Sequence, residues 1–438
     1  MTYADRDFHR YTRSYWRNCD TDERRAIVDE NLELINQGVE EWNEFDTAFA
    51  EYIKKHNILD PYYYFEGASF SGNANFRGAT FSGDVDFKQA TFNEYAYFRE
   101  ATFSGDVDFE QATFNEYANF EKATFSGAAY FNEANFSGDV DFQGATFSGH
   151  VDFEGATFNE DVDFQGAIFS EDADFRGANF SRDTHFEGAT FSREAFFMEA
   201  TFSGRAHFEG ATFDGRSFFI GVENKSILDL TNVTAKNSVP IFSGMEYKIP
   251  PIIDGLSVPE PDGNSDSYIA SYRQLKMIAI AGANHEMEVE FFGYETQCKL
   301  YLDETPMLSR LLIKSYRFFS NFGQSVWRPA LGLGVIFLVA CVLTRITVEA
   351  GYDPVACENA EYTGAFGSKS EAALSQSIDF ILPILKADRG TLRQRNQCLY
   401  GHDGVPGINR VINFIQQIVS LVFLFLAGLA IRNRFKIK

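Results

Sequence analysis

Phenylalanine recurs from Phe65 to Phe219 at spacings that alternate five and six residues, so every second ring stands eleven positions from the last. A small residue, most often Ala or Val, occupies the position two before nearly every Phe. In extended backbone these two positions point to the same side, so each short strand would bury one large and one small side chain. The chain is therefore expected to form an array of short, repeated strands.

A longer period of 22 residues accompanies the first. Residues 79–100 return almost unchanged as residues 101–122. Because 22 residues hold four strand units, a four-sided coil fits, and each coil would bury its apolar face by stacking on the next. A recent duplication would also produce the same echo. A helical array is disfavoured, because a Gly or Asn after most Phe, as at Gly83, breaks helices.

The repeated unit over residues 62–220 is a small residue, any residue, then Phe, followed by two polar positions, and it resembles the pentapeptide-repeat proteins. The resemblance implies a right-handed quadrilateral β-helix with the Phe rings stacked in interior columns. The extra residue in every second unit departs from the family's pattern and predicts a bulged corner. About seven coils, spaced ~4.8 Å apart like paired strands, would form a rod roughly 34 Å long.

The charge of the chain limits its partners. There are 38 basic and 62 acidic residues, a net charge of −24, and the acids concentrate on outward positions such as Asp84 and Asp86. Nucleic acid is therefore not expected as a partner. The simplest interpretation is a solvated acidic surface. The alternative is DNA mimicry, because some pentapeptide-repeat proteins present an acidic rod to type II topoisomerases.

Composition divides the chain into five expected segments. A charged segment with helical patterning precedes the repeats, and a stretch rich in Pro and Gly, which breaks helices and central strands, follows them. Amphipathic helices and two long apolar runs complete the chain. The segments are an N-terminal helical segment (1–60), a repeat β-helix (61–239), a linker (240–266), cytoplasmic or interfacial helices (267–325) and a transmembrane domain (326–438).

The two apolar runs predict membrane spans at residues 327–345 and 410–431, with a buried helical hairpin as the alternative. Basic residues before the first run and after the second predict that both termini, and the repeats, are cytoplasmic at a cell membrane. We expect no signal peptide before the repeats, because residues 1–60 are charged and helical in pattern. The connecting loop would then lie outside, where Cys357 and Cys398 could form a disulfide.

The loop and the second run resemble a pore-loop channel in their layout. Residues 371–385 predict a short re-entrant pore helix, with a helix resting on the outer surface as the alternative. The polar residues of the second run share one helical face, which would line a water-filled path or hydrogen-bond to another helix. The predicted pore-lining residues are Asn413, Gln416, Gln417, Ser420 and Leu424, and the predicted gate comprises Ala427, Gly428 and Ile431.

The expected pore mouth carries Pro383, Lys386, Asp388 and Arg389. Two-span potassium channels, which this layout resembles, have Thr-Val-Gly-Tyr-Gly here, whereas this chain has ILKADRG at 384–390. Potassium selectivity is therefore doubtful, and anion or weakly selective conduction fits equally. Two spans cannot enclose a pore, so the channel hypothesis requires a homo-oligomer, expected to be a tetramer.

No catalytic, cofactor or metal motif stands out. The chain lacks a Gly-rich phosphate loop, G-x-S-x-G and C-x-x-C, and His285 beside a run of Glu is interpreted as a solvated face. An enzyme is the least favoured class. Three hypotheses follow: an oligomeric ion channel with a cytoplasmic rod, which the polar face favours; a membrane-tethered protein-binding scaffold without a pore; and an anchored topoisomerase mimic. The expected partners are a lipid bilayer, further copies of the chain, inorganic ions and a cytoplasmic protein on the rod.

Overall fold

The structure of the protein is a computed structural model, and its chain forms two compact units, residues 1–287 and 288–438. Within these units the structure describes residues 8–13, 15, 21–56, 61–261, 268–302, 305–322, 325, 327–348, 414–415 and 417–428.

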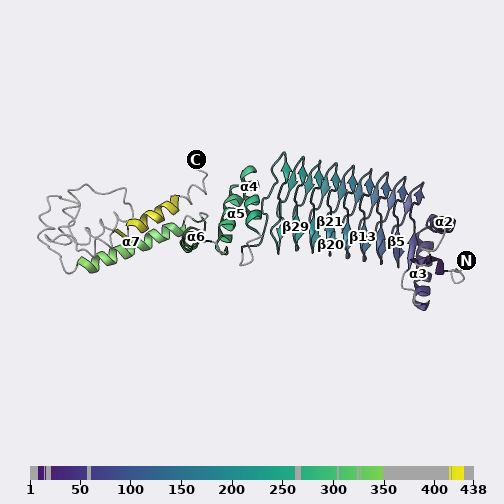
Figure 1. The fold of residues 1–438 in the computed structure, drawn as a ribbon, viewed down its shortest axis with the longest axis horizontal. Coiled ribbons are helices and arrows are strands. Elements are labelled where there is room, and N and C mark those ends of the chain that lie inside the picture. The colour runs from purple at the N-terminus through teal and green to yellow at the C-terminus, as the bar shows by residue number, and fades with distance from the viewer. Residues whose placement is uncertain are drawn as a thin grey trace. The chain divides into compact units, whose positions relative to one another are not determined.

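The first unit is a parallel β-solenoid with four sheets (Figure 1). Sheet 1 contains β1 (Tyr62–Tyr64), β5 (Asp84–Asp86), β9 (Val107–Asp108), β13 (Ala129–Tyr130), β17 (Val151–Asp152), β21 (Ala173–Asp174), β25 (Ala195–Phe196) and β29 (Ser217–Phe218). Sheet 2 contains β2 (Ser69–Phe70), β6 (Thr91–Phe92), β10 (Thr113–Phe114), β14 (Asn135–Phe136), β18 (Thr157–Phe158), β22 (Asn179–Phe180), β26 (Thr201–Phe202), β30 (Glu223–Asn224) and β33 (Glu246–Tyr247).

The other two sheets complete the four sides of each coil. Sheet 3 contains β3 (Ala74–Asn75), β7 (Ala96–Tyr97), β11 (Ala118–Asn119), β15 (Val140–Asp141), β19 (Val162–Asp163), β23 (Thr184–His185), β27 (Ala206–His207) and β31 (Leu228–Asp229). Sheet 4 contains β4 (Thr80–Phe81), β8 (Thr102–Phe103), β12 (Thr124–Phe125), β16 (Thr146–Phe147), β20 (Ile168–Phe169), β24 (Thr190–Phe191), β28 (Thr212–Phe213) and β32 (Thr234–Ala235).

The pairing register confirms the four-sided coil. Each strand pairs in parallel with the strand one coil later, so that Phe125 lies beside Phe147, 22 positions on. The same register pairs Thr184 with Ala206, far from the duplicated segment 79–122. The 22-residue period is therefore the length of one coil from β1 to β32, whereas the last coil is one residue longer, since Glu223 pairs with Glu246. The four sheets hold eight or nine strands each, which is more than the seven coils expected.

The Phe rings form the predicted interior columns. Phe142 has no exposed surface, and its ring stacks on Phe164 at a centroid distance of 4.9 Å and an interplanar angle of 1°. Phe153, on the opposite side of the coil, meets the Phe142 ring edge-on at 5.6 Å and 80°. Such pairs add about 1 kcal/mol each to the gain from burying the ring. The aromatic columns are therefore the main stabilising core.

Two kinds of corner alternate around each coil, which accounts for the alternating spacing. After Phe142 the chain turns within four residues, Ala145 N–H donates to the Phe142 carbonyl at 2.9 Å, and Gly144 has φ +63° as a type II turn requires. The longer corner, as at Phe81-Ser82-Gly83, brings the Gly against the backbone of the previous coil: a Cβ on Gly83 would lie 2.6 Å from the Pro61 carbonyl oxygen. The sixth residue of this unit therefore belongs to a corner whose backbone contacts the backbone of the previous coil.

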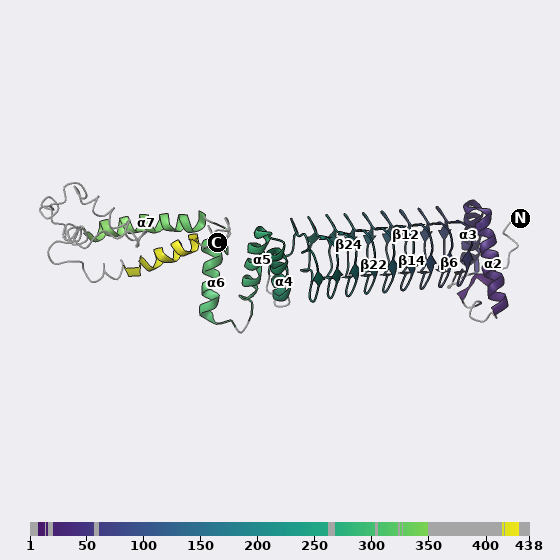
Figure 2. The same cartoon turned by 90° about the horizontal axis from the view of Figure 1, so that it is seen from above.

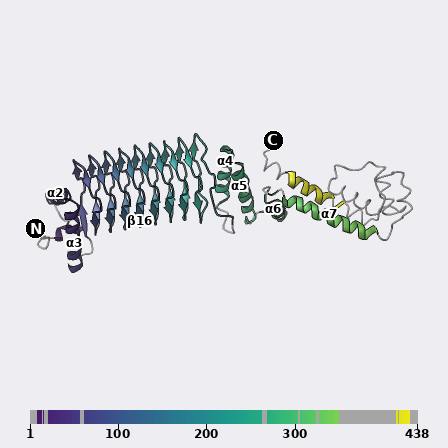
Figure 3. The same cartoon turned by 180° about the vertical axis from the view of Figure 1, so that it is seen from behind.

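Two helices cover the first coil, as Figures 1 and 3 show. They are α2 (Thr21–Gln37) and α3 (Val39–His56), preceded by the short helix η2 (Phe8–Tyr11). Trp42 is fully buried and its indole N–H donates to the Thr80 carbonyl at 2.9 Å, while Asn31 donates to the Tyr64 carbonyl at 3.0 Å. These bonds satisfy carbonyls at an otherwise open end of the sheets.

The predicted linker 240–266 is wrong for most of its length, because the chain continues the solenoid. Ile241, Ile252 and Ser257 form parallel bridges to Phe218, Asp229 and Thr234. Proline is tolerated here because the last coil pairs on one side only and some of its N–H groups need no partner strand. Helix α4 (Ile269–Ala281) then packs on this coil: Tyr272 O–H donates to the Pro259 carbonyl at 2.6 Å, and Phe242 N–H donates to Gln274 at 3.2 Å.

The second unit is helical where it is described. It contains α6 (Met307–Ser320), α7 (Trp327–Val348) and helical residues 417–428, and α5 (His285–Cys298) lies at its start. Helix α7 runs beside 417–428 in both views (Figures 1 and 2). A Cβ on Gly332 would overlap the Phe423 ring, so the α7 backbone touches this ring.

The predicted membrane spans are not supported by the described residues. Among them, no helix combines the length and apolar character needed to cross a bilayer. The expected first span coincides with α7, while the expected second span is described only at residues 414–415 and 417–428.

Candidate functional site

The acids expected on the outside of the solenoid are partly buried, since Asp86 is 7% exposed, and they have a structural role as well as a charge. Asp86, the last residue of β5, accepts a hydrogen bond from the backbone N–H of Lys88 at 2.9 Å. The same hydrogen bond, to an Asp side chain from the backbone N–H two residues later, recurs in sheets 1 and 3. One example is the bond from Gln165 N–H to Asp163 at 2.7 Å. Asp is favoured where its side chain replaces a backbone acceptor in a turn. A part of the acidity is therefore explained by the corners and not by a partner.

These carboxylates are costly to ionise. Burial raises the pKa of Asp86 to about 6, although Lys88 N–H and Tyr62 O–H, at 2.8 Å, donate to it and oppose this effect. Burial also raises the pKa of Asp108, Asp152 and Asp163. Like-charged carboxylates stack in these columns, and Asp108 adds to the shift at Asp86. The solenoid therefore holds protons more tightly than its unfolded chain does.

Lowering the pH from 7 to 5 is expected to raise the free energy of unfolding. A carboxyl whose pKa is raised on folding stabilises the fold when protonated, so its contribution is complete below the unfolded pKa near 3.8 and is lost as the pH rises through about 6. Asp86 alone accounts for about 1 kcal/mol of this change. Urea unfolding at the two pH values measures it. Asp86→Asn should remove the contribution of Asp86 to this pH dependence, whereas the control Glu94→Gln, at an exposed position, should not. Equal pH dependence in the two variants would contradict the role given to Asp86.

Helix α6 carries an exposed apolar face. Leu308, Leu311, Leu312 and Phe318 are each more than 60% exposed. Trp327, at the start of α7, is 74% exposed. Large side chains at this density are unusual on a surface that meets only water. The second unit therefore presents a candidate docking surface.

A cationic pocket lies beside that face. Its volume is about 600 Å³, and Lys314, Arg317 and Arg328 line it together with Leu300, Tyr301, Phe318 and Asn321. The Arg328 guanidinium donates to the Arg317 carbonyl at 3.4 Å, which ties α7 to the end of α6. In a chain of net charge −24, three cations around one pocket form a local anion-binding environment.

The predicted pore residues are described only in part. Asn413, Gln416 and Ile431 lie outside the described residues, as do the pore helix 371–385 and the mouth residues Pro383, Lys386, Asp388 and Arg389. Cys357 and Cys398 lie outside them as well. These assignments stay predictions.

The described members of the predicted pore face do not share one environment. Ser420 is fully buried, Gln417, Leu424 and Ala427 are half-buried, and Gly428 is exposed. Phe423, three residues after Ser420, is buried and lies against Gly332 of α7. In the single chain Ser420 is therefore buried, but among the described residues its Oγ has no hydrogen-bond partner, so hydrogen bonding to another helix stays a prediction.

The repeated segment matches a known family model. Residues 65–113, 87–134, 109–157, 131–178 and 175–223 match the model described as Pentapeptide repeats (9 copies). These are pentapeptide repeats. We found no match to the chain among curated proteins or among solved structures. The matched residues lie within the solenoid, so the pentapeptide-repeat assignment applies to residues 65–223 and does not extend to the helices before or after them.

Proposed function

We propose that the protein is a pentapeptide-repeat scaffold whose helical unit docks on an anionic lipid membrane while its acidic solenoid offers a binding surface for another protein. The observation that carries this proposal is the contrast between the surfaces. The solenoid presents columns of carboxylates, whereas α6 presents apolar side chains beside three cations. The proposed location is the cytoplasmic face of a membrane, where anionic lipids attract basic segments.

The α6 face has the chemistry of an interfacial helix. Leu308, Leu311 and Leu312 would enter the boundary between headgroups and acyl chains, and burying each would contribute about 2 kcal/mol. Lys314 and Arg317 on the same helix would contribute about 1 kcal/mol each against an anionic leaflet. Apolar burial and charge together are what stable, reversible membrane binding requires.

The solenoid would then hold its partner at the membrane. Its rigid stack of coils offers straight columns of carboxylates, which suit a basic protein surface. A type II topoisomerase is one partner that such acidity would suit. Charge complementarity of this kind mainly raises association rate and specificity, so binding should weaken with salt.

An oligomeric ion channel is the second candidate. The line of Asn413, Gln416, Gln417 and Ser420 on one helical face favours it, because polar groups in a membrane helix commonly face water. The burial of Ser420 in the single chain favours the scaffold instead. A channel would require several copies of the chain and inorganic ions as its substrate.

Removing the α6 cations is expected to weaken lipid binding. The variant Lys314→Gln with Arg317→Gln loses about 2 kcal/mol of attraction, so its partition coefficient onto vesicles with one third anionic lipid should fall about 30-fold. Flotation of the purified full chain with preformed vesicles measures this. The control is Lys54→Gln with Lys55→Gln, which removes the same charge from exposed positions at the end of α3.

Equal flotation of the two double variants, or binding to neutral vesicles as strong as to anionic ones, would overturn the docking proposal. Planar-bilayer recording of the same protein separates the second candidate. Currents that Gln416→Leu or Ser420→Leu abolishes would favour the channel over the scaffold.

A further inference from the structure

Two histidines stand in register on sheet 3 of the solenoid. His185 and His207 end β23 and β27 and pair across the sheet, and their rings stack at a centroid distance of 4.8 Å and an interplanar angle of 2°. Each has a glutamate two residues later: His185 Nδ1 lies 3.0 Å from Glu187 Oε1, and His207 Nδ1 lies 3.1 Å from Glu209 Oε1. Two successive coils therefore present the same His–Glu pair.

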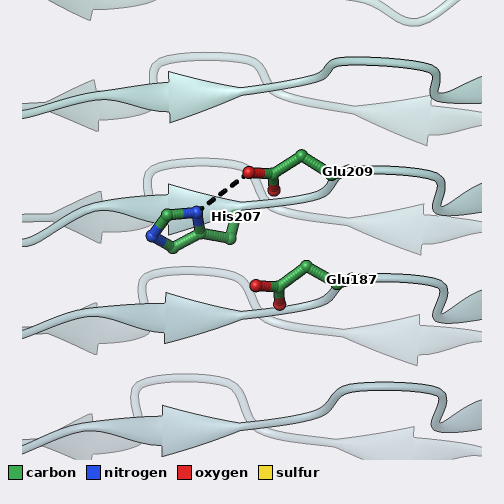
Figure 4. A group of neighbouring side chains, drawn as sticks. All are labelled: Glu187, His207 and Glu209. Atoms are coloured by element: carbon green, nitrogen blue, oxygen red, sulfur yellow. Dashed lines mark hydrogen bonds and ion pairs between the residues drawn. The ribbon is translucent and has the colours of Figure 1, made fainter.

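Three of these side chains converge on one point. One donor atom each from Glu187, His207 and Glu209 lies within 4.8 Å of the other two. Figure 4 shows His207 and Glu209 on one coil and Glu187 on the coil next to it, with its carboxylate turned toward the same space. The donors come from backbone that the sheet pairing and the corners hold in place, so the arrangement exists before any ligand binds.

The carboxylates of this cluster have unused acceptor oxygens. Glu187 Oε2 and Glu209 Oε2 are shielded from solvent, and within the described part of the chain neither has a hydrogen-bond partner. Withholding a charged oxygen from both water and a donor costs free energy. A cation bound beside the imidazole would pair with both oxygens and remove this cost.

A similar cluster on sheet 1 shows how the solenoid supplies a cation elsewhere. Asp152, Glu154 and Asp174 also lie with their donor atoms within 4.8 Å. There Arg176 supplies the positive charge, because its guanidinium contacts Asp174 at 2.7 Å and Glu154 at 2.6 Å. At the position corresponding to Arg176, two residues after the strand, sheet 3 has Glu209 instead. Among the described residues, no Lys or Arg forms an ion pair with Glu187 or Glu209.

We propose that Glu187, His207 and Glu209 bind a divalent transition-metal ion of the Zn²⁺ class. One imidazole and two carboxylates suit Zn²⁺, Ni²⁺ or Co²⁺, whereas Mg²⁺ and Ca²⁺ prefer oxygen ligands alone. Ligand bonds of about 2.0–2.2 Å require the donor atoms, which now lie within 4.8 Å of one another, to move closer together by rotation of their side chains. Three protein ligands leave a fourth position open for water or for a group of a partner protein.

His185 is a positioning residue in this proposal. Its hydrogen bond to Glu187 Oε1 occupies that oxygen and leaves Oε2 available as a ligand, and hydrogen-bonded partners of this kind orient ligating carboxylates in metal sites. The column continues with Asp163 before His185 and Asp229 after His207, which keeps the local potential negative. The bound ion would link one coil to the next on the side of the solenoid.

The test is a Zn²⁺ titration of the tag-free, full-length protein at pH 7, read by equilibrium dialysis with metal analysis. We expect saturable binding of one ion per chain at this cluster. His207→Ala and Glu209→Gln should each weaken it at least tenfold, and His185→Ala should weaken it less. His150→Ala and Glu154→Gln, which alter a histidine outside the cluster and a carboxylate of the cluster on sheet 1, should leave the affinity unchanged.

A second readout separates ligation from general attraction of cations. Co²⁺ in the unmodified protein should give a visible absorption band that Zn²⁺ abolishes and a millimolar excess of Mg²⁺ does not. Circular dichroism confirms that each variant keeps its fold. The proposal fails if Zn²⁺ binds without saturation, if Mg²⁺ displaces it equally, or if folded His207→Ala and Glu209→Gln retain the full affinity.

Discussion

Replacing Phe142 with Ala is expected to lower the free energy of unfolding by about 4 kcal/mol. The ring is fully buried and stacks between Phe120 at 4.7 Å and Phe164 at 4.9 Å. Truncation removes both stacks and leaves a cavity in the middle of the column that the fixed coil spacing prevents from closing. Because each coil is stabilised mainly by its neighbours, the loss also uncouples the coils on either side. Guanidinium unfolding followed by circular dichroism measures the change.

The control for this prediction is Ile168→Ala. Ile168 lies on sheet 4 of the same solenoid, but its side chain points outward and is 43% exposed. A change within about 0.5 kcal/mol is expected, as for most exposed positions. Similar losses in the two variants would mean that the Phe columns are not the main source of stability.

Replacing Gly204 with Ala is expected to cost about 3 kcal/mol. Gly204 occupies the longer corner, where an added Cβ would overlap the Arg182 carbonyl group and lie 2.6 Å from the Asp183 nitrogen. Both obstacles are backbone atoms of the previous coil, so no side-chain rotation relieves the overlap. The two coils must separate locally, which weakens the sheet pairing on either side of the corner. Thermal unfolding of the full chain measures the loss as a lower Tm.

Gly72 provides a matched control at the same kind of corner. It follows Phe70 and Ser71 as Gly204 follows Phe202 and Ser203, but it lies in the first coil. No heavy atom lies within 4 Å of a Cβ built there. Gly72→Ala should be neutral or stabilise the fold by about 0.5 kcal/mol, because Ala restricts the unfolded chain. A loss at Gly72 as large as that at Gly204 would refute the role of the contact between coils.

The repeat fold was predictable because its rules are local. A small residue two positions before each Phe defines which side of a strand is buried, and the 22-residue echo defines the coil. Both sequence patterns translate directly into structure, because each coil contacts only its neighbouring coils and repeats their pattern. The observed pairing of Phe125 with Phe147 could thus be derived from residue numbers alone.

The helical unit was harder to predict from the same sequence. An apolar run predicts that a helix is buried but does not identify what covers it. Lipid, a second helix or a second copy of the chain would each cover an apolar helix. Ser420 illustrates this: on a helical wheel it belongs to a polar stripe, whereas in the structure it is buried three residues before Phe423, which contacts Gly332 of α7. Packing partners that are distant in sequence decided this environment.

The sequence by itself determined the four-sided coil, the Phe columns and the acidity of the solenoid, because each follows from spacing or composition. The tertiary structure alone decided that residues 241–257 form a last coil, since their pairing with β29, β31 and β32 outweighs the Pro and Gly content. It also decided the convergence of Glu187, His207 and Glu209. Their sequence predicted no metal site, and only a coil that returns after 22 residues places a carboxylate of one turn beside the imidazole of the next.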